Sequence, residues 1–198
     1  SSTLLLNPCP LCGGTSATKL LSIPYRRIWS ALQQRHGAAF TDETLQRLTP
    51  AEFTQLVACR DCDLHYFRPA FAGDSSFYGQ LTQSDPHYYN ANTWDFQQAL
   101  QLVPKDSRLL DVACGSGAFV SMARKHGLDA SGIDTNRSAI SAGHACGLPL
   151  TCTSLAAFSE QHSAFFDVVT AFQVLEHLED VLSFTRAAAA CVRPGGLV

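Results

Sequence analysis

The chain has 198 residues, of which 46% are hydrophobic and 16% charged, a composition that supplies enough apolar surface for a packed core. Its net charge is −3, and neither the first 108 residues (nine basic, nine acidic) nor the rest (five basic, eight acidic) offers the basic surface that nucleic-acid binding usually requires. No apolar run approaches the roughly 20 residues that span a bilayer, and the N-terminus shows no basic leader, so we expect a cytoplasmic protein with no membrane span.

Two Cys-x-x-Cys pairs contain four of the eight cysteines: Cys9, Cys12, Cys59 and Cys62. In a chain that we expect to be cytoplasmic, clustered pairs favour a metal over disulfides. Four thiolates suit tetrahedral zinc, and a closed set of four protein ligands is typical of a structural site, so we predict structural zinc here. An iron–sulfur cluster, a redox dithiol and four unligated thiols are the alternatives, with His65 and His87 as alternative ligands.

Residues 1–70 are predicted to form a zinc-ribbon-like module with a helical insertion between the cysteine pairs. Helical spacing covers 26–40 and 42–57, and Thr49-Pro50 has the pattern of an N-cap followed by proline at the first helical position. Residues 64–67 have the composition of a strand.

Residues 71–107 are predicted to be a linker followed by an N-terminal helix. The stretch from 69 to 93 is rich in Asp, Ser, Tyr, Asn and Pro and lacks a regular pattern, which indicates an irregular segment. Residues 94–103 have helical character, and Pro104 follows that helix.

From residue 108 to 198, strand patterns alternate with helix patterns. We predict strands at 109–113, 129–133, 148–152 and 165–172, helices at 118–126, 136–145, 155–160 and 178–191, and a fifth strand that begins at 197 after a turn at 193–196. Such alternation predicts an α/β fold with a mostly parallel, Rossmann-like sheet.

A nucleotide-type cofactor site is predicted at the turn from Asp111 to Gly117, between the first of these strands and its helix. Glycines let the backbone approach a ligand closely, and the helix N-terminus offers free N–H groups to an anion. A dinucleotide turn would need a third glycine, and Val120 occupies that position. Asp134, at the end of the next strand, is placed to accept hydrogen bonds from ribose hydroxyls.

These residues resemble the motifs of the class I S-adenosylmethionine-dependent methyltransferases. The first motif is Ala113-Cys114-Gly115-Ser116-Gly117, with alanine in place of the family's first glycine. The resemblance continues through Gly132-Ile133-Asp134, residues 166–169, residues 172–177 and Arg193-Pro194-Gly195-Gly196. Several motifs in the right order over about 90 residues are far more specific than a lone glycine loop.

The resemblance implies S-adenosylmethionine as the cofactor and assigns nine residues to it: Asp111 to the ammonium group, Ala113, Gly115 and Gly117 to the methionine part, Asp134 to the ribose, Thr135 and Leu155 to the adenine, and Phe172 and Gln173 to the sulfonium side. A general base helps if the acceptor is a hydroxyl or a carbon acid, and His177 is the leading candidate. Glu176, Tyr88 and Tyr89 are weaker candidates. His177 alternatively braces the following helix.

The resemblance therefore implies an enzyme that transfers a methyl group to a small-molecule, sugar, lipid or natural-product acceptor. Some bacterial methyltransferases that resemble this chain carry such a four-cysteine module, in which zinc is structural. A non-catalytic zinc-ribbon interaction protein with a degenerate cofactor-binding domain, a zinc-finger RNA methyltransferase and an oxidoreductase are the alternatives. The family's sheet continues beyond its fifth strand, so we expect a C-terminally truncated domain, whose open sheet edge favours a homodimer.

Overall fold

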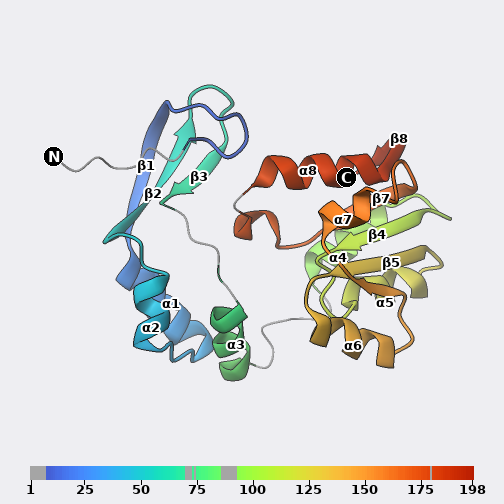
Figure 1. Ribbon diagram of the computed structural model, residues 1–198, viewed down its shortest axis with the longest axis horizontal. Coiled ribbons are helices and arrows are strands. Elements are labelled where there is room, and N and C mark those ends of the chain that lie inside the picture. Colours follow the sequence, from blue (N-terminus) through green and yellow to red (C-terminus); the bar gives the residue numbers. More distant parts are fainter. Residues whose placement is uncertain (1–7, 70–72, 74, 86–92, 179) are drawn as a thin grey trace. The chain divides into compact units, whose positions relative to one another are not determined.

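The computed structural model describes residues 8–69, 73, 75–85, 93–178 and 180–198, and the chain divides into two units, residues 1–89 and 90–198 (Figure 1). Each unit has its own hydrophobic core. Within the described residues, no helix is long and apolar enough to cross a membrane.

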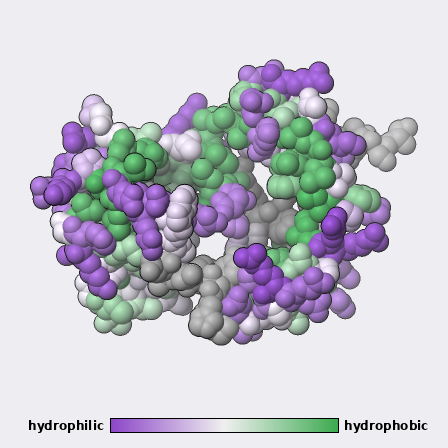
Figure 2. All heavy atoms as spheres, turned by 180° about the vertical axis from the view of Figure 1, so that it is seen from behind, coloured by the Kyte–Doolittle hydropathy of each residue, from purple (hydrophilic) through white to green (hydrophobic). Residues whose placement is uncertain are grey.

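The first unit contains a three-stranded antiparallel sheet of order β1-β2-β3, with β1 at Ala17–Pro24, β2 at Phe53–Cys59 and β3 at His65–Arg68. Directly opposed residues Leu21, Leu56 and Phe67 lie in one row across the three strands. Leu21 and Phe67 are exposed, and Figure 2 shows hydrophobic side chains gathered over this sheet.

Three helices of the first unit surround a separate small core. They are α1 (Tyr25–His36), α2 (Asp42–Arg47) and α3 (Ser75–Ser84). Thr41 caps α2, because its hydroxyl oxygen accepts a hydrogen bond from the Thr44 N–H. Their shared core is formed by Ala38, Leu48, Phe77 and Leu81, with Trp29, Leu32, Phe40 and Tyr78 packed against it.

Two expectations for this unit are wrong. The helix predicted over 42–57 ends at Arg47, and Thr49-Pro50 leads into strand β2 instead of a second helix. Thr49 does not cap a helix because its hydroxyl donates to the Leu45 carbonyl and accepts from the Trp29 indole N–H. The segment expected to be irregular contains helix α3, whose Phe77 and Leu81 are buried in the core.

The second unit is built on a five-stranded sheet of order β6-β5-β4-β7-β8 in which every neighbouring pair is parallel. Its strands are β4 (Arg108–Val112), β5 (Asp129–Asp134), β6 (Leu150–Cys152), β7 (Phe166–Ala171) and β8 (Val192–Leu197). Central β4 is almost wholly buried, as expected for a parallel strand covered on both faces.

Helices cover both faces of this sheet (Figure 1). One face carries α4 (Trp94–Leu102), α5 (Ala118–Lys125) and α6 (Arg137–Ala145), whose apolar side chains pack around Leu109. The opposite face carries α7 (Leu155–Ser159) and α8 (Val181–Cys191), packed around Leu110 and Val169. A 3₁₀ turn, η1 (Leu175–His177), follows β7. The predicted Rossmann-like α/β fold is confirmed.

The C-terminal strand begins earlier than predicted. The expected turn at Arg193–Gly196 lies inside β8, which pairs with β7 only at Val192 and Leu197 and is irregular between them. Asp167 holds this irregular part, because its carboxylate accepts a hydrogen bond from Arg193 Nε–H as well as one of 2.7 Å from the Arg108 backbone N–H.

Candidate functional site

The strand order of the second unit draws attention to the carboxyl edge of its sheet next to β4. The chain leaves β4 towards β5 on one side and later returns to β7 on the other, so the strand order reverses at β4. In open parallel sheets a crevice opens outside the carboxyl ends of the strands at such a reversal. The turn that follows β4 lies at this edge.

Three residues of this turn adopt left-handed backbone conformations, with φ of 56° at Ala113, 57° at Gly115 and 84° at Gly117. A Cβ atom at Gly117 would lie 2.8 Å from Leu148 Cδ1, so a side chain at this position would collide with the core. A Cβ atom at Gly115 would meet nothing within 4 Å, so the backbone there faces open space. Helix α5 begins immediately after the turn, and its first N–H groups therefore lie close to that space.

Cys114, in the middle of the turn, is buried against the neighbouring strand. Its backbone N–H donates to the Ile133 carbonyl over 3.0 Å, and a Cβ atom at Gly132 would lie only 2.7 Å from its Sγ atom. Burial raises the pKa of the Cys114 thiol to about 12, so this thiol is neutral at ordinary pH. Because Gly132 has no side chain, the turn can pack directly against β5 at this point.

Asp134 connects the end of β5 to the turn. Its Oδ2 atom accepts a 2.8 Å hydrogen bond from the Gly115 N–H, and its Oδ1 atom accepts a 2.7 Å bond from the Asn136 N–H. Each carboxylate oxygen can accept a second hydrogen bond, so two oriented acceptor sites remain for a ligand with neighbouring hydroxyls. Thr135 is exposed beside it, and Asn136 caps α6 by accepting from the Ser138 and Ala139 N–H groups.

Asp111 is the one acidic residue buried in the described part of this unit, with 3% of its surface exposed. Burial raises the pKa of its carboxyl group to about 7, a hydrogen bond from Thr170 lowers it, and the nearby charge of Asp134 raises it further. The Thr170 hydroxyl donates to Asp111 Oδ1 over 2.9 Å. In its ionised form this buried carboxyl group would attract a nearby cation.

The residues predicted near the sulfonium and the adenine differ in exposure: Thr135 and Gln173 are exposed, whereas Phe172 is half-buried and Leu155 is buried. The rings of Phe172, Phe96 and Phe119 contact one another, and the Phe172 ring centroid lies 4.7 Å from that of Phe96 and 4.6 Å from that of Phe119. Gln173, the next residue, is exposed and has a left-handed backbone with φ of 54°. Leu155 is 8% exposed and belongs to the core between α7 and α8, where it supports the sheet.

His177 ends the 3₁₀ turn η1 after β7 and is exposed. Its Nε2 atom lies 4.0 Å from Glu176 Oε1, and its backbone N–H donates to the Val174 carbonyl. These contacts leave its ring able to reach solvent. The other predicted candidates, Tyr88 and Tyr89, and the alternative ligand His87 lie outside the described residues.

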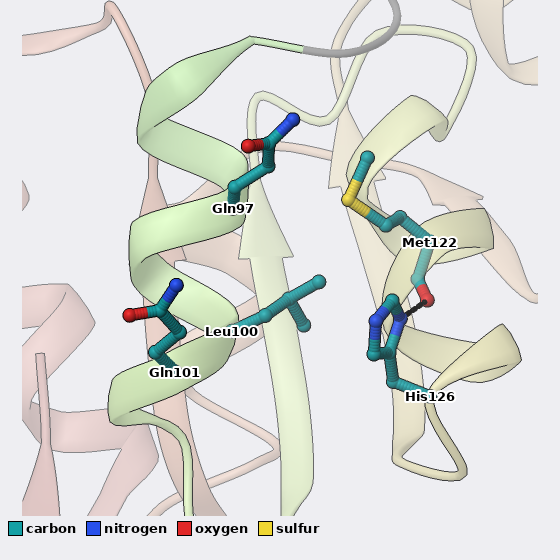
Figure 3. A pocket seen from close by; sticks show the side chains of 5 residues that line it. All are labelled: Gln97, Leu100, Gln101, Met122 and His126. Atoms are coloured by element: carbon teal, nitrogen blue, oxygen red, sulfur yellow. Dashed lines mark hydrogen bonds between the residues drawn. The ribbon is translucent and has the colours of Figure 1, made fainter.

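Two hollows of the second unit lie away from this edge. One of about 240 Å³ lies between α4 and α5 and is lined by Gln97, Leu100, Gln101, Met122 and His126. Figure 3 shows these side chains around it, with the His126 ring turned towards the Met122 carbonyl. A neighbouring hollow of about 650 Å³ includes residues 103–106 and 126–128, just before β4 and β5, so both lie away from the turn.

The four cysteines of the first unit come together into one cluster. Their Sγ atoms all lie within 4.8 Å of one another, and the Cys9–Cys62 and Cys12–Cys59 distances are both 3.6 Å. Zinc bound tetrahedrally at about 2.3 Å from each sulfur requires sulfur–sulfur distances of about 3.8 Å. The donor set and its spacing therefore fit a tetrahedral soft metal ion. His65 is not a member of the cluster.

Two backbone turns of the same shape hold these sulfurs. In each turn the fifth residue is left-handed and donates its N–H to the carbonyl of the first cysteine, Gly13 to Cys9 and Asp63 to Cys59. Backbone N–H groups also point at sulfur, from Gly14 to Cys12 and from Asp61 to Cys59. Such matching pairs of turns are preorganised for a metal, because N–H groups directed at sulfur stabilise the thiolate.

The thiols of the cluster differ in how readily they lose a proton. Burial opposes ionisation of the Cys9 thiol, but hydrogen bonds from the backbone of Cys12 and Leu11 lower its pKa to about 7. A hydrogen bond from the Leu64 backbone favours ionisation of Cys62, whereas burial and the neighbouring thiols raise its pKa to about 12. Negative charge on one sulfur opposes charge on the next, and a bound cation would relieve this repulsion.

Three residues of the candidate site were missed at the sequence level: Thr170, Asn136 and Phe96. Thr170 is a polar residue inside the otherwise apolar strand β7, and Asn136 stands two residues after the strand-end aspartate. Both signals are visible in the sequence. Phe96 is one of several apolar residues of α4, and only its contact with Phe172 singles it out.

Residues 87–198 match the family model described as a methyltransferase domain. Among curated proteins, the chain is 35% identical over 97 residues to the ubiquinone biosynthesis O-methyltransferase of Vibrio vulnificus (strain YJ016), covering 46% of this chain and 41% of the relative. It is 38% identical over 98 residues to the protein of the same name from Methylobacterium sp. (strain 4-46), covering 45% and 38%. The chain thus spans about two fifths of these relatives' length.

Solved structures similar to this chain include a SAM-dependent methyltransferase from Bacteroides fragilis in complex with S-adenosyl-L-homocysteine, at 23% identity and a TM-score of 0.46, covering 54% of this chain and 46% of that one. Another is a SAM-dependent methyltransferase from Archaeoglobus fulgidus, at 18% identity and a TM-score of 0.44, covering 50% and 46%.

Proposed function

The chain belongs to the methyltransferase-domain family, whose model matches residues 87–198, and on this basis we propose that it transfers a methyl group from S-adenosylmethionine to a small-molecule, sugar, lipid or natural-product acceptor. The observation that carries the proposal is the hydrogen bond from the Gly115 N–H to Asp134. It holds a carboxylate that can accept hydrogen bonds from ribose hydroxyls next to an open glycine turn. A dinucleotide would need a third glycine where Val120 is fully buried.

The cofactor would lie along the carboxyl edge of the sheet. Asp134 would accept hydrogen bonds from the ribose hydroxyls, while Ala113, Gly115 and Gly117 would border the methionine part with their backbone. Asp111 would attract the ammonium group, since an ionised carboxyl group in a buried setting interacts strongly with a nearby cation. The bound cofactor supplies the methyl group. Thr135 with Leu155 beside the adenine, and Phe172 with Gln173 beside the sulfonium, complete the proposed site.

Positioning of the acceptor would provide much of the rate acceleration, because holding two reactants in line corresponds to effective molarities of about 10⁵ M or more. The curated relatives are O-methyltransferases by name, so a hydroxyl group is the first acceptor class to test. A hydroxyl acceptor loses a proton during transfer, and His177 is our proposed general base because its exposed ring follows β7 at this edge.

Calorimetry with S-adenosylhomocysteine and S-adenosylmethionine tests cofactor binding, and release of S-adenosylhomocysteine with a panel of hydroxyl acceptors tests turnover. We expect binding of both ligands and turnover with at least one acceptor. A folded protein that binds neither ligand would rule out the proposal. Binding without turnover on any acceptor class would favour the non-catalytic alternative.

We further propose that Cys9, Cys12, Cys59 and Cys62 hold a structural zinc ion. The support is the spacing of the four sulfurs and the matching backbone turns. Elemental analysis of the purified protein should find about one zinc per chain. Cys59→Ser should lose most of it, whereas Cys146→Ser, at an exposed cysteine of the second unit, should retain it. Iron with sulfide in the wild type, or no metal, would contradict the assignment.

A further inference from the structure

We propose that Thr170 is a positioning residue for the methyl donor: its hydroxyl group fixes the carboxyl group of Asp111 in the orientation that receives the cofactor's ammonium group. The inference rests on the proposed function, because it concerns the same cofactor edge. Thr170 was not among the residues that the sequence assigns to the site, and its role follows from a contact between two strands.

The register of the sheet places the two residues together. Asp111 on β4 and Thr170 on β7 are direct partners in the parallel pairing, and the Thr170 hydroxyl donates to Asp111 Oδ1 over 2.9 Å. The same hydroxyl lies 3.4 Å from the Leu110 carbonyl, a longer and weaker contact. Thr170 is the hydrogen-bond donor that favours the ionised form of this carboxyl group.

Asp111 needs such a donor because its surroundings oppose its charge. It is 3% exposed, and on its other side β5 contributes Gly132, which has no side chain to offer a hydrogen bond. The titratable groups that interact with it are Cys114 in the turn, which is neutral at ordinary pH, and Asp134 at the end of β5, whose negative charge is unfavourable. A hydrogen bond to the ionised form is therefore the stabilising contribution from within the described protein.

The direction of the pH effect follows from this arrangement. Burial raises the pKa of Asp111 to about 7, and the Thr170 hydrogen bond opposes that rise because it favours the ionised form. The ammonium group of the ligand binds the ionised carboxyl group, so affinity increases as pH rises through this pKa. Removing the hydroxyl group raises the pKa further and moves the increase in affinity to higher pH.

The test is the affinity for S-adenosylhomocysteine between about pH 5.5 and 8.5 in the wild type, Thr170→Val and Thr170→Ser. Valine has nearly the same shape without the hydroxyl group, and serine retains the hydroxyl group. We expect the midpoint of the wild-type profile near the pKa of Asp111, a shift of about one unit upward in Thr170→Val, and the wild-type midpoint in Thr170→Ser. Near neutral pH, the valine variant should bind about fivefold more weakly and recover at high pH.

Methylthioadenosine is the matched ligand, since it carries the adenosine part but no amino-acid group. Its affinity should not show the shift that depends on Thr170. A Thr170→Val variant that weakens S-adenosylhomocysteine equally at every pH, or that shifts methylthioadenosine in the same way, would overturn the inference and indicate a purely structural hydroxyl group. Failure of the wild type to bind either ligand would instead overturn the proposed function, so the two failures are distinguishable.

Discussion

Replacing Asp134 with asparagine gives the sharpest test of the proposed cofactor edge, because the substitution changes one oxygen and the charge but hardly the shape. In the structure both carboxylate oxygens accept backbone N–H groups, from Gly115 and from Asn136. The amide would turn an NH₂ group towards one of these donors, so one backbone hydrogen bond is lost. On the ligand side, one ribose hydroxyl loses its acceptor and the other keeps only a neutral amide oxygen.

The magnitude follows from the strength of these bonds. A hydrogen bond to a charged group contributes about 1.5–3 kcal/mol, so Asp134→Asn should weaken S-adenosylhomocysteine roughly 10- to 150-fold by calorimetry. Asp129→Asn is the matched control, since it makes the same change at the exposed start of the same strand, and its affinity should stay at the wild-type value. A 2′-deoxy analogue of the ligand should lose little additional affinity in Asp134→Asn, because the lost contact is shared.

An Asp134→Asn protein that binds within about threefold of the wild type would refute this reasoning. So would equal losses in Asp129→Asn and Asp134→Asn, because the effect would then be one of net charge. A full additional loss with the deoxy analogue would show that the carboxylate and the hydroxyl act independently.

Three further predictions concern other parts of the molecule. Removing the proposed zinc ion with a chelator should increase hydrogen exchange in β1–β3 of the first unit and leave β4–β7 protected, because a metal held by these four cysteines would stabilise the unit that contains them. Gly132→Ala should destabilise the second unit by about 1–3 kcal/mol in denaturant unfolding, since its Cβ atom would lie 2.7 Å from Cys114 Sγ, and Cys114→Gly in the same protein should recover part of that loss. His177→Gln should lower kcat about 10²- to 10⁴-fold with unchanged S-adenosylhomocysteine affinity, whereas the control His126→Gln makes the same change at the exposed end of α5 and should leave kcat unchanged. An unchanged kcat in His177→Gln would exclude His177 as the base.

The turn after β4 could be predicted from the sequence because its constraints are local. Gly117 must have a positive φ where a Cβ atom would collide with the core, and Gly115 opens the backbone to a ligand. Asp134 was predictable for a related reason, since strand ends in parallel sheets meet at one edge. The structure adds that the two are joined by a hydrogen bond.

The contact between Asp111 and Thr170 could not be predicted in this way. It depends on the register of β4 against β7, which are separated in sequence by two other strands and three helices. Register is set by packing of both sheet faces and leaves no local pattern in either strand. Thr170 was therefore visible as a polar residue in an apolar strand, but its partner was not.

The error at Thr49-Pro50 has a different cause. The local pattern is that of a helix start, but the strand that follows is determined by pairing with β1 over Ala17–Pro24, more than 25 residues earlier in the chain. The burial of Thr54 and Val57 in that sheet outweighs the local preference. The pairing of β2 with β1 therefore outweighs a local helix pattern that is only a few residues long.

The antiparallel pairing of β1 with β2 has a consequence for how this protein can diversify. Pro24 and Phe53 face each other at the end of the pair, and the Tyr25 N–H donates to the Glu52 carbonyl, so the segment carrying α1 and α2 leaves and re-enters the sheet at one point. Changes in the length or sequence of that segment need not disturb the cysteine turns at the other end of the strands, because closing a longer loop costs little free energy. Any exchange of those two helices would have to keep the apolar side chains that pack on Phe77 and Leu81 of α3, whereas the cysteine scaffold at the other end of the sheet could stay constant.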